Sequence, residues 1–327
     1  MKKKFLFAIL IVIFTVNNFT FAYLNVIDLG TLGGNTSSAG SVNNNGQIAG
    51  YAKNSSGKYL ACLFDSTGNG ANIDLGTLGE LGSEALSINN HGQIVGWARN
   101  YPFRDRACAC FFDPTGGGAN VDLGTIAGYA NSEARSINDN GQIVGSCFTT
   151  GSSPSSIIYR ACLFDSTGNG ANIDLGTLGG NSSKAICINN SNQIAGYART
   201  DSGYEHACLF DPTGNGANID LGTLTGNYSA AYAINNKGRI IGDADYQPCL
   251  FDPTGQGNNI NLSSLIDPAS GWTLLMVNGI NDNDWVVGIG AHNGQLHGVL
   301  FVIPEPMTIA LLTLGGLAVI SKRKTKI

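Results

Sequence analysis

Asp28-Leu29-Gly30-Thr31, Asn43-Asn44-Asn45-Gly46-Gln47-Ile48-Ala49-Gly50 and Ala61-Cys62-Leu63-Phe64-Asp65 are the three parts of a unit that recurs six times in this chain. The unit starts at Asp28, Asp74, Asp122, Asp174, Asp220 and, in degenerate form, Asn261. The first Asn of the middle part falls at Asn43, Asn89, Asn138, Asn189, Asn235 and Asn281, with spacings of 46, 49, 51, 46 and 46 residues. Such a period is typical of propellers and solenoids, because one unit cannot bury its own apolar face.

Each unit predicts short β-strands joined by tight turns. The run 61–64 is apolar on both faces, as expected for a strand sandwiched between neighbouring sheets. The loop 65–72 is rich in residues that tolerate turns, and it recurs almost unchanged at Asp165 and Asp211. Three or four strands in each of six ~46-residue repeats predict an all-β fold, a six-bladed β-propeller, with a β-solenoid as the alternative.

The phase of the repeat predicts how a propeller would close. Inside the chain every Cys-Leu-Phe strand is followed by an Ile-Asp-Leu-Gly strand with which it can form a hairpin. The first such strand, near Ile27, has no preceding partner, and the last Val-Leu-Phe strand, near Leu300, has no following one. We therefore expect these two strands to pair, which would remove two exposed sheet edges.

The two ends of the chain predict export. Residues 1–22 combine three lysines, an apolar run and a small-residue site for cleavage after Ala22, as in a signal peptide. Residues 23–303 form the six-repeat β domain. Residues 304–327 hold Pro304-Glu305-Pro306, the apolar stretch 307–320, which is short for a permanent membrane span, and a basic tail. A plain C-terminal anchor is the alternative interpretation of this segment.

The order Pro-Glu-Pro, short apolar helix and basic tail resembles the PEP-CTERM sorting signal of Gram-negative bacteria. That resemblance covers residues 303–326 and implies processing by signal peptidase and an exosortase-type enzyme. It also implies transient membrane association through residues 307–320 and delivery to the cell surface or the extracellular matrix. Extracellular polysaccharide or a cell-surface glycan is the partner that the resemblance suggests.

The charge of residues 23–303 excludes one class of partner. Without the two terminal segments the chain carries a net charge of about −11 with His neutral. Nucleic acid and anionic membrane surfaces require a cationic patch, and no run of Lys or Arg interrupts the repeats. We therefore expect no nucleic-acid partner; such a surface suits cations, neutral sugars or simply solubility.

Cysteines at one repeat position predict buried thiols rather than a disulfide framework. This position holds Cys62, Cys110, Cys162, Cys208 and Cys249. Equivalent positions in neighbouring blades should lie beyond the ~7 Å limit on Cα separation for a disulfide. Cys108, Cys147 and Cys187 fall outside the pattern, so a bridge involving them stays open.

The repeats also resemble the HAF-repeat family of bacterial extracellular proteins. The similarity covers Asp28 to Phe301, and His206-Ala207-Cys208-Leu209-Phe210 is the copy nearest to the motif that gives the family its name. Elsewhere the His position holds other residues, so no catalytic role is carried over to it. The resemblance implies a repeat architecture and a surface location, without an activity.

Two chemical sites can be considered from the residue types. The loops starting at Asp65, Asp165 and Asp211 partly imitate a calcium loop, although they lack the Glu at position 12. Turns explain these loops more simply, and no cofactor is predicted, calcium being the alternative. Its candidate ligands are Asp65, Asn69, Asp165, Asn169, Asp211 and Asn215. His292 and His297 could meet as a metal pair across a strand, but two solvated histidines are the simpler interpretation.

The function that these observations favour is binding or scaffolding by an exported surface or matrix protein, and not catalysis. No catalytic motif occurs, so no catalytic residue is predicted. Aromatic residues in Asn-rich loops could stack on sugar rings, with packing in the core or between blades as an alternative of at least equal weight. They are Tyr51, Trp97, Tyr101, Tyr129, Tyr197, Tyr204 and Tyr228. The alternative function is a secreted carbohydrate-active enzyme, a hydrolase or lyase on a propeller scaffold.

Overall fold

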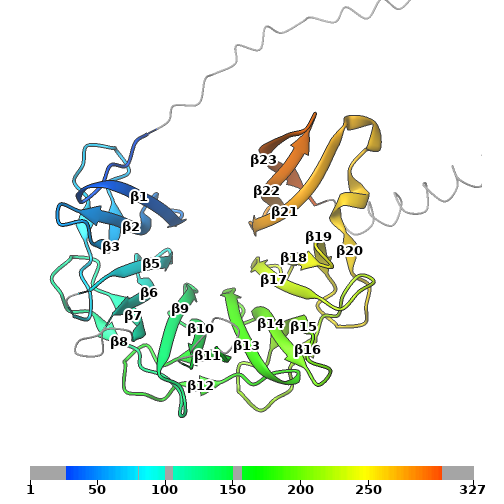
Figure 1. Ribbon diagram of the computed structural model, residues 1–327, viewed down its shortest axis with the longest axis horizontal. Coiled ribbons are helices and arrows are strands. Elements are labelled where there is room, and N and C mark those ends of the chain that lie inside the picture. Colours follow the sequence, from blue (N-terminus) through cyan, green and yellow to red (C-terminus); the bar gives the residue numbers. More distant parts are fainter. Residues whose placement is uncertain (1–26, 80, 100–105, 150–156, 304–327) are drawn as a thin grey trace, which may run out of the picture.

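The computed structural model describes residues 27–79, 81–99, 106–149 and 157–303, and in them the chain is almost entirely β-structure. Figure 1 shows six antiparallel sheets arranged in chain order around a central axis, which confirms the six-bladed β-propeller and rejects the solenoid. Five sheets have four strands and the last has three. The expected signal peptide and sorting segment, with Ala22 and Pro304-Glu305-Pro306, lie outside the described residues.

The blades follow the sequence units. Blade 1 comprises β1 (Gly33–Val42), β2 (Ile48–Asn54), β3 (Tyr59–Phe64) and β4 (Ile73–Asp74); blade 2 comprises β5 (Ser83–Ile88), β6 (Ile94–Arg99), β7 (Ala107–Phe112) and β8 (Val121–Asp122). Blade 3 comprises β9 (Asn131–Ile137), β10 (Ile143–Phe148), β11 (Tyr159–Phe164) and β12 (Ile173–Asp174); blade 4 comprises β13 (Gly179–Ile188), β14 (Ile194–Thr200), β15 (Glu205–Phe210) and β16 (Ile219–Asp220). Blade 5 comprises β17 (Ser229–Ile234), β18 (Ile240–Ala244), β19 (Gln247–Phe251) and β20 (Ile260–Asn261); blade 6 comprises β21 (Trp272–Ile280), β22 (Trp285–His292) and β23 (Gln295–Val302).

The core consists of the layers between blades, and the alternation along each strand explains it. In β3, Ala61 and Leu63 belong to the cluster shared with blade 2. Cys62 and Phe64 point to the opposite side, where Leu29 and Leu32 pack against them. A strand that is covered on both faces must be apolar at every position, as the sequence predicts.

The fourth strand of each complete blade is supplied by the next sequence unit. In blade 1, Cys62 pairs with Asp74 and Leu63 with Ile73 in antiparallel register, which confirms the predicted hairpin. Two short 3-10 turns, η2 (Leu262–Leu265) and η3 (Pro268–Ser270), precede blade 6. Among the described residues, none of the helical segments has the length and apolar character that crossing a membrane requires.

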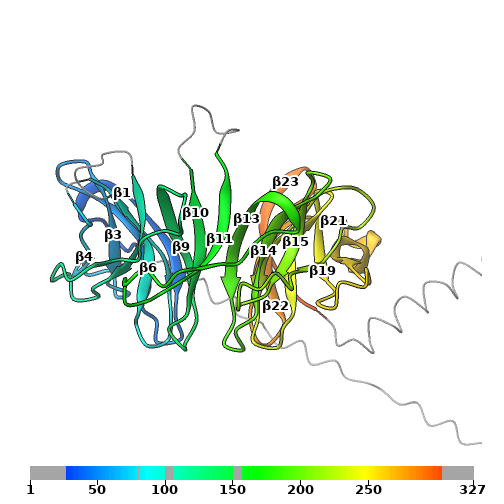
Figure 2. The same cartoon turned by 90° about the horizontal axis from the view of Figure 1, so that it is seen from below.

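The antiparallel strands place the loops on two opposite faces (Figure 2). One face, which we call the turn face, carries two loops of each blade: the loop between its first and second strands and the loop between its third and fourth strands. The opposite face, which we call the variable face, carries the loop between the second and third strands of each blade and the connection from each fourth strand to the next blade. The turn face repeats nearly the same sequence in every unit, whereas the loops of the variable face differ from unit to unit.

The ring is open between blades 1 and 6, which differs from the prediction that Ile27 lies beside Leu300. β23 ends its sheet, and no strand pairing joins it to residues 27–42. Residues 29–32 lie instead against β2 and β3 of blade 1, where the side chain of Asn72 donates to Leu29 O (2.8 Å) and Thr31 O (3.2 Å). These contacts explain why the first strand stays with its own blade.

Candidate functional site

The Asp-rich loops of the turn face use their carboxylates internally. Asp65 Oδ1 accepts from the amide (2.9 Å) and hydroxyl (2.7 Å) of Thr67, and Oδ2 accepts from the amide of Asn69 (3.2 Å). The hydrogen bond from the Thr67 hydroxyl is the main cause of the lowered pKa of Asp65. Asp165 and Asp211 accept from the following Thr in the same way, and Asn69, Asn169 and Asn215 donate to that Thr. The geometry of all six calcium candidates is that of a hydrogen-bonded turn.

A ladder of asparagines on the turn face links successive blades around the axis. Asn138 Nδ2 donates to Asn189 O (3.0 Å), and the Asn138 side-chain oxygen accepts from the amides of Asn140 (3.1 Å) and Gln142 (2.9 Å). The same inter-blade bond joins Asn43 to Asn89, Asn89 to Asn138, Asn189 to Asn235 and Asn235 to Asn281. These turns, from all six units, line a polar cavity of about 350 Å³. Sequence reasoning found the turns but missed their role between blades.

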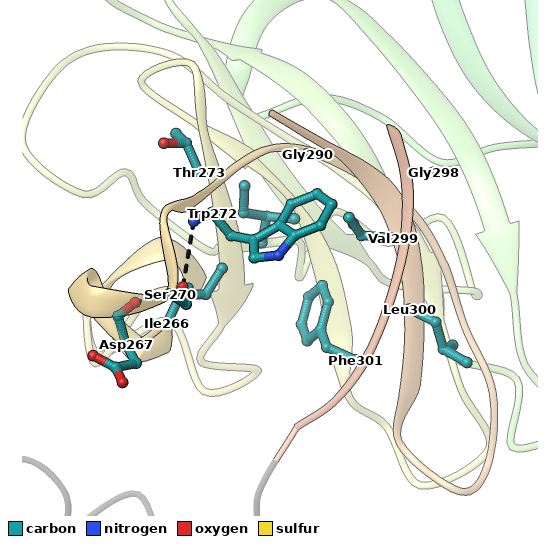
Figure 3. A pocket seen from close by; sticks show the side chains of 11 residues that line it. Ile266, Asp267, Ser270, Trp272, Thr273, Gly290, Gly298, Val299, Leu300 and Phe301 are labelled. Atoms are coloured by element: carbon teal, nitrogen blue, oxygen red, sulfur yellow. Dashed lines mark hydrogen bonds between the residues drawn. The ribbon is translucent and has the colours of Figure 1, made fainter. Parts of the chain in front are cut away.

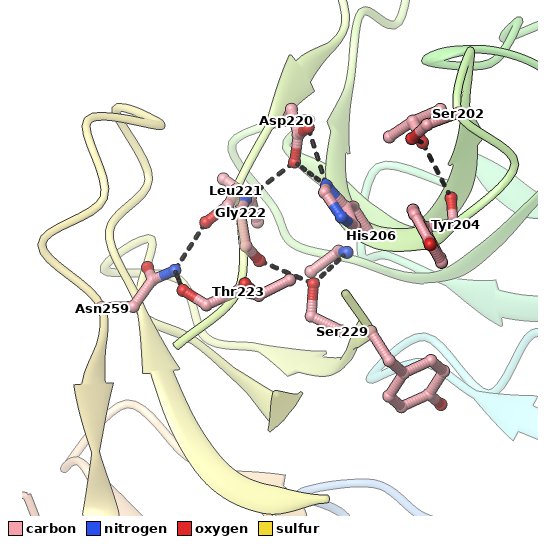
Figure 4. A network of polar contacts seen from close by, with 12 residues as sticks. Ser202, Tyr204, His206, Asp220, Leu221, Gly222, Thr223, Ser229 and Asn259 are labelled. Atoms are coloured by element: carbon pink, nitrogen blue, oxygen red, sulfur yellow. Dashed lines mark hydrogen bonds and ion pairs between the residues drawn. The ribbon is translucent and has the colours of Figure 1, made fainter. Parts of the chain in front are cut away.

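His206 and Asp220 form a pair of the kind that enzymes use for acid–base catalysis. His206 Nδ1 lies 2.9 Å from Asp220 Oδ2 (Figure 4). Arg160 and Asp174 form the equivalent ion pair one blade earlier, at 3.6 Å. The nearby Ser229 hydroxyl donates to Gly222 O (2.6 Å) and accepts from the Ala207 amide (2.8 Å). Because Ser83 and Ser183 make the same pair of bonds, this hydroxyl has a structural role repeated across blades.

The remaining sequence candidates for metal or redox chemistry are packed residues. His292 stacks on Trp272 with ring centroids 4.7 Å apart, and His297 meets the same indole edge-on at 5.6 Å. In the part of the chain that the structure describes, no three His, Cys, Asp or Glu side chains gather as metal ligands would. All eight cysteines are free thiols, seven of them buried. Burial is the first cause of the raised pKa of Cys62, to about 12, so this thiol stays protonated.

Most of the aromatic candidates contact other side chains of the fold. Tyr51 packs edge-on against Tyr59 (5.5 Å), Trp97 Nε1 donates to Glu84 Oε2 (3.2 Å), and the Tyr129 hydroxyl accepts from Arg160 Nε (3.3 Å). Tyr197 is half-buried, and this burial is the main cause of its raised pKa. Tyr101 lies outside the described residues. Packing within the fold therefore accounts for the described members of this group.

Tyr204 and Tyr228, by contrast, meet at a cleft of about 610 Å³ on the variable face of blades 4 and 5. One wall is the β14–β15 hairpin, where Arg199 Nε lies 3.4 Å from Glu205 Oε1 beside the exposed Tyr204. The other walls are the loop 224–228 and the β18–β19 turn, which carries Tyr246. Three tyrosines, an ion pair and the Asn227 amide thus line one surface cleft.

Asp245 fixes the loop that carries Asn227 and Tyr228. Its Oδ2 accepts from the amides of Leu224 (3.2 Å), Thr225 (2.8 Å) and Gly226 (2.7 Å), and its Oδ1 accepts from that of Tyr228 (3.3 Å). Burial opposes ionisation of this carboxyl, but the backbone amides outweigh burial and lower its pKa below 3.8. A Cβ on Gly226 would lie 2.4 Å from Asp245 Oδ1, so a larger residue there would displace the carboxylate from the loop.

The turn that presents Tyr246 is strained. Asp245 and Tyr246 have φ of 53° and 62°, a left-handed conformation that is uncommon for residues other than glycine. Tyr246 is 82% exposed, and its ring stacks on Tyr228 at 5.4 Å with an interplanar angle of 14°. Strained backbone of this kind persists only where surrounding contacts hold it, and it concentrates at binding sites. Sequence analysis missed Tyr246, for which the Asp-Tyr pair between two apolar strands was the available signal.

Comparisons with known proteins give no family. No family model matches the chain, and no curated protein matches it. Among solved structures, a gluconolactonase from Xanthomonas campestris is similar with a TM-score of 0.44 and 10% identity, over 81% of this chain and 85% of that chain. A likeness at this level carries no inference about activity.

Proposed function

We propose that this protein is an exported surface or matrix-associated repeat module that binds or scaffolds extracellular polysaccharide. The observation that carries the proposal is the tyrosine-lined cleft of blades 4 and 5, with Tyr204, Tyr228 and Tyr246 at its walls. Aromatic faces stack on the apolar C–H faces of sugar rings, while neighbouring amide and charged groups hydrogen-bond the hydroxyls. The acidic, Asn-rich composition and the sorting-signal resemblance support the same partner.

The site is pre-organised, which favours binding. Asp245 holds the loop 224–228 through four amides, and the Tyr228–Tyr246 stack fixes two aromatic faces before a ligand arrives. Ordering such groups in advance lowers the entropic cost of association. A shallow surface cleft suits weak contacts that many copies on a matrix would reinforce by multivalency.

A retention assay tests this proposal against the enzyme alternative. The purified chain is mixed with exopolysaccharide from the native host, and both sedimented protein and released reducing ends are measured. We expect retention on the polysaccharide without release of product. The His206–Asp220 pair is the contact that favours the enzyme, so product release that His206→Ala abolishes would establish a hydrolase or lyase instead.

A further inference from the structure

Blade 6 has two glycines where the other blades have small side chains. At the position of Gly290 in β22 the other blades hold a fully buried alanine or cysteine, and at the position of Gly298 in β23 four of them hold a fully buried alanine. These counterparts are Ala52, Ala98, Cys147, Ala198 and Ala244 for the first position, and Ala61, Ala109, Ala161 and Ala207 for the second. A Cβ on Gly290 would lie 2.9 Å from Val299 Cγ1 and 3.3 Å from Trp272 Cε3. The missing side chain therefore gives the Trp272 indole a flat stretch of backbone to lie against.

A cavity of about 480 Å³ is lined by residues of β21, β22, β23 and the η2–η3 segment (Figure 3). Its walls are mostly apolar, with Trp272 and Leu274 from β21, Val299 and Phe301 from β23, and Ile266 from the segment. Val299 and Phe301 are partly exposed, whereas the Cys and Phe at their positions in the other blades are at most 4% exposed. The volume and the apolar walls are typical of a small-molecule site.

Neighbouring side chains hold the Trp272 indole in place before any ligand arrives. The indole stacks on His292 with ring centroids 4.7 Å apart, and His297 meets it edge-on at 5.6 Å. The backbone amide of Trp272 donates to Ser270 Oγ (3.3 Å). With these contacts formed, 37% of Trp272 is still exposed. An aromatic surface that is ordered in advance lowers the entropic cost of binding.

The polar side chains of the lining already bond to the protein itself. Ser270 Oγ donates to Asp267 O (2.6 Å) and accepts from the Trp272 amide, and Asp267 Oδ1 accepts from the Ala269 amide (2.9 Å). A sugar ring in this cavity would bury hydroxyls against apolar walls without partners, which costs free energy. The cavity therefore favours an apolar ligand, unlike the tyrosine-lined cleft of blades 4 and 5, with which it shares no lining residue.

Charge narrows the class of ligand further. Asp267 is the only charged residue among the described residues that line the cavity, and residues 23–303 carry a net charge of about −11. An anionic ligand would be repelled by this carboxylate and by the field of the whole domain. A cation would lose its hydration against the apolar walls. A neutral ligand avoids both costs.

We propose that this cavity binds a small neutral molecule with a flat aromatic ring, a function separate from the polysaccharide binding proposed above. The ring stacks offset or edge-to-face with Trp272 and Phe301, as aromatic rings prefer. Its flat shape suits the backbone at Gly290, and Ile266 and Leu274 cover its edges. An acyl chain would gain similar burial, but it could not stack and would lose more rotational freedom.

Calorimetric titrations of the full chain at about pH 7 test the site with three probes. These are 2-naphthol, which is neutral and aromatic, 2-naphthoate, which adds a negative charge to the same rings, and 1-octanol, which is neutral and flexible. We expect 2-naphthol to bind at one site and the other two probes to bind at least about tenfold more weakly. Trp272→Ala should weaken 2-naphthol binding about tenfold, because the cavity loses its main stacking surface. Trp285→Ala is the matched control and should bind as the wild type does, since Trp285 is 49% exposed in the same blade but does not line the cavity.

Three results would overturn the proposal: no binding of 2-naphthol, equal affinity in Trp272→Ala and the wild type, or binding of 1-octanol or 2-naphthoate as tight as that of 2-naphthol. Polysaccharide retention should be unchanged in Trp272→Ala, so this test fails or succeeds independently of the cleft of blades 4 and 5. If Trp272→Ala does not fold, the unmodified chain decides by nuclear magnetic resonance. The indole N–H signal of Trp272 should shift on saturation with 2-naphthol, and an unshifted signal would contradict binding at this cavity.

Discussion

The turn face and the variable face of this propeller are built from the same blades but differ in what repeats. On the turn face, the Asn ladder and the Asp65-type loops recur from unit to unit, and their polar side chains are bonded within the fold. On the variable face, each blade has its own loops, and blades 4 and 5 present exposed tyrosines. Repetition therefore marks residues that hold blades together, and departure from it marks residues available to a ligand.

The largest effect on stability is expected when one asparagine of the ladder on the turn face is replaced. Asn138 is 3% exposed and satisfies two amides of its own turn and a carbonyl of blade 4. We expect Asn138→Ala to reduce the free energy of unfolding by about 2–4 kcal/mol, because buried partners lose their hydrogen bonds. Urea unfolding measures the change. The exposed neighbour Asn140→Ala serves as the control, and an equal loss in both variants would show that burial in the ladder has no special role.

A smaller effect is expected when Asp245, which holds the loop 224–228 at the tyrosine-lined cleft, is replaced. Asp245→Ala should lower stability by about 1–2 kcal/mol and weaken polysaccharide retention, because the four amides of the loop 224–228 lose their acceptor. Asp245→Asn keeps the shape with a weaker acceptor and should give an intermediate loss in both assays. Unchanged retention in Asp245→Ala, with the loss of stability as expected, would remove this loop from the binding site.

The lowered pKa of Asp245 predicts the pH range in which this carboxylate stabilises the protein. Since its folded pKa lies below the ordinary 3.8, its contribution is fully present above that value and is lost as the pH falls through the folded pKa. The difference in unfolding free energy between the wild type and Asp245→Ala should stay constant from about pH 8 to pH 5 and shrink below about pH 4. A difference that already shrinks near pH 6 would assign the effect to another group.

The smallest effect is expected at the Asp-rich turns. Asp165 is exposed at its carboxylate and bonds only to its own loop and Thr167. Asp165→Asn should therefore lower the melting temperature slightly, and a chelator should change neither the melting temperature nor polysaccharide retention. A rise in melting temperature on adding calcium, lost in Asp165→Asn, would show that these loops bind the ion after all.

The sequence predicts the fold correctly because the signals for its strands and turns are local and are repeated in each unit. The apolar runs such as 61–64, the turns and the period each specify a strand or a loop, and five of six blades follow them completely. The cleft was found only in part, because Tyr246 stacks on Tyr228 through a turn whose geometry the sequence does not state, and Tyr204 comes from the preceding unit. The opening between blades 1 and 6 was also missed. It follows from contacts that hold residues 29–32 on blade 1, among them the bonds from Asn72 to Leu29 O and Thr31 O, which lie more than 40 residues apart in the chain.

The central claim is that the variable face of blades 4 and 5 binds sugar, and a calorimetric titration tests it most directly. Oligosaccharides prepared from the host exopolysaccharide are titrated into the wild type, into Tyr204→Ala with Tyr246→Ala, and into Tyr59→Ala. Tyr59 is an exposed tyrosine of blade 1 outside the cleft and serves as the control. We predict that the double variant binds about tenfold more weakly, since loss of two stacking faces costs on the order of 1–3 kcal/mol, while Tyr59→Ala binds as the wild type does. Equal affinity in all three proteins would contradict the account.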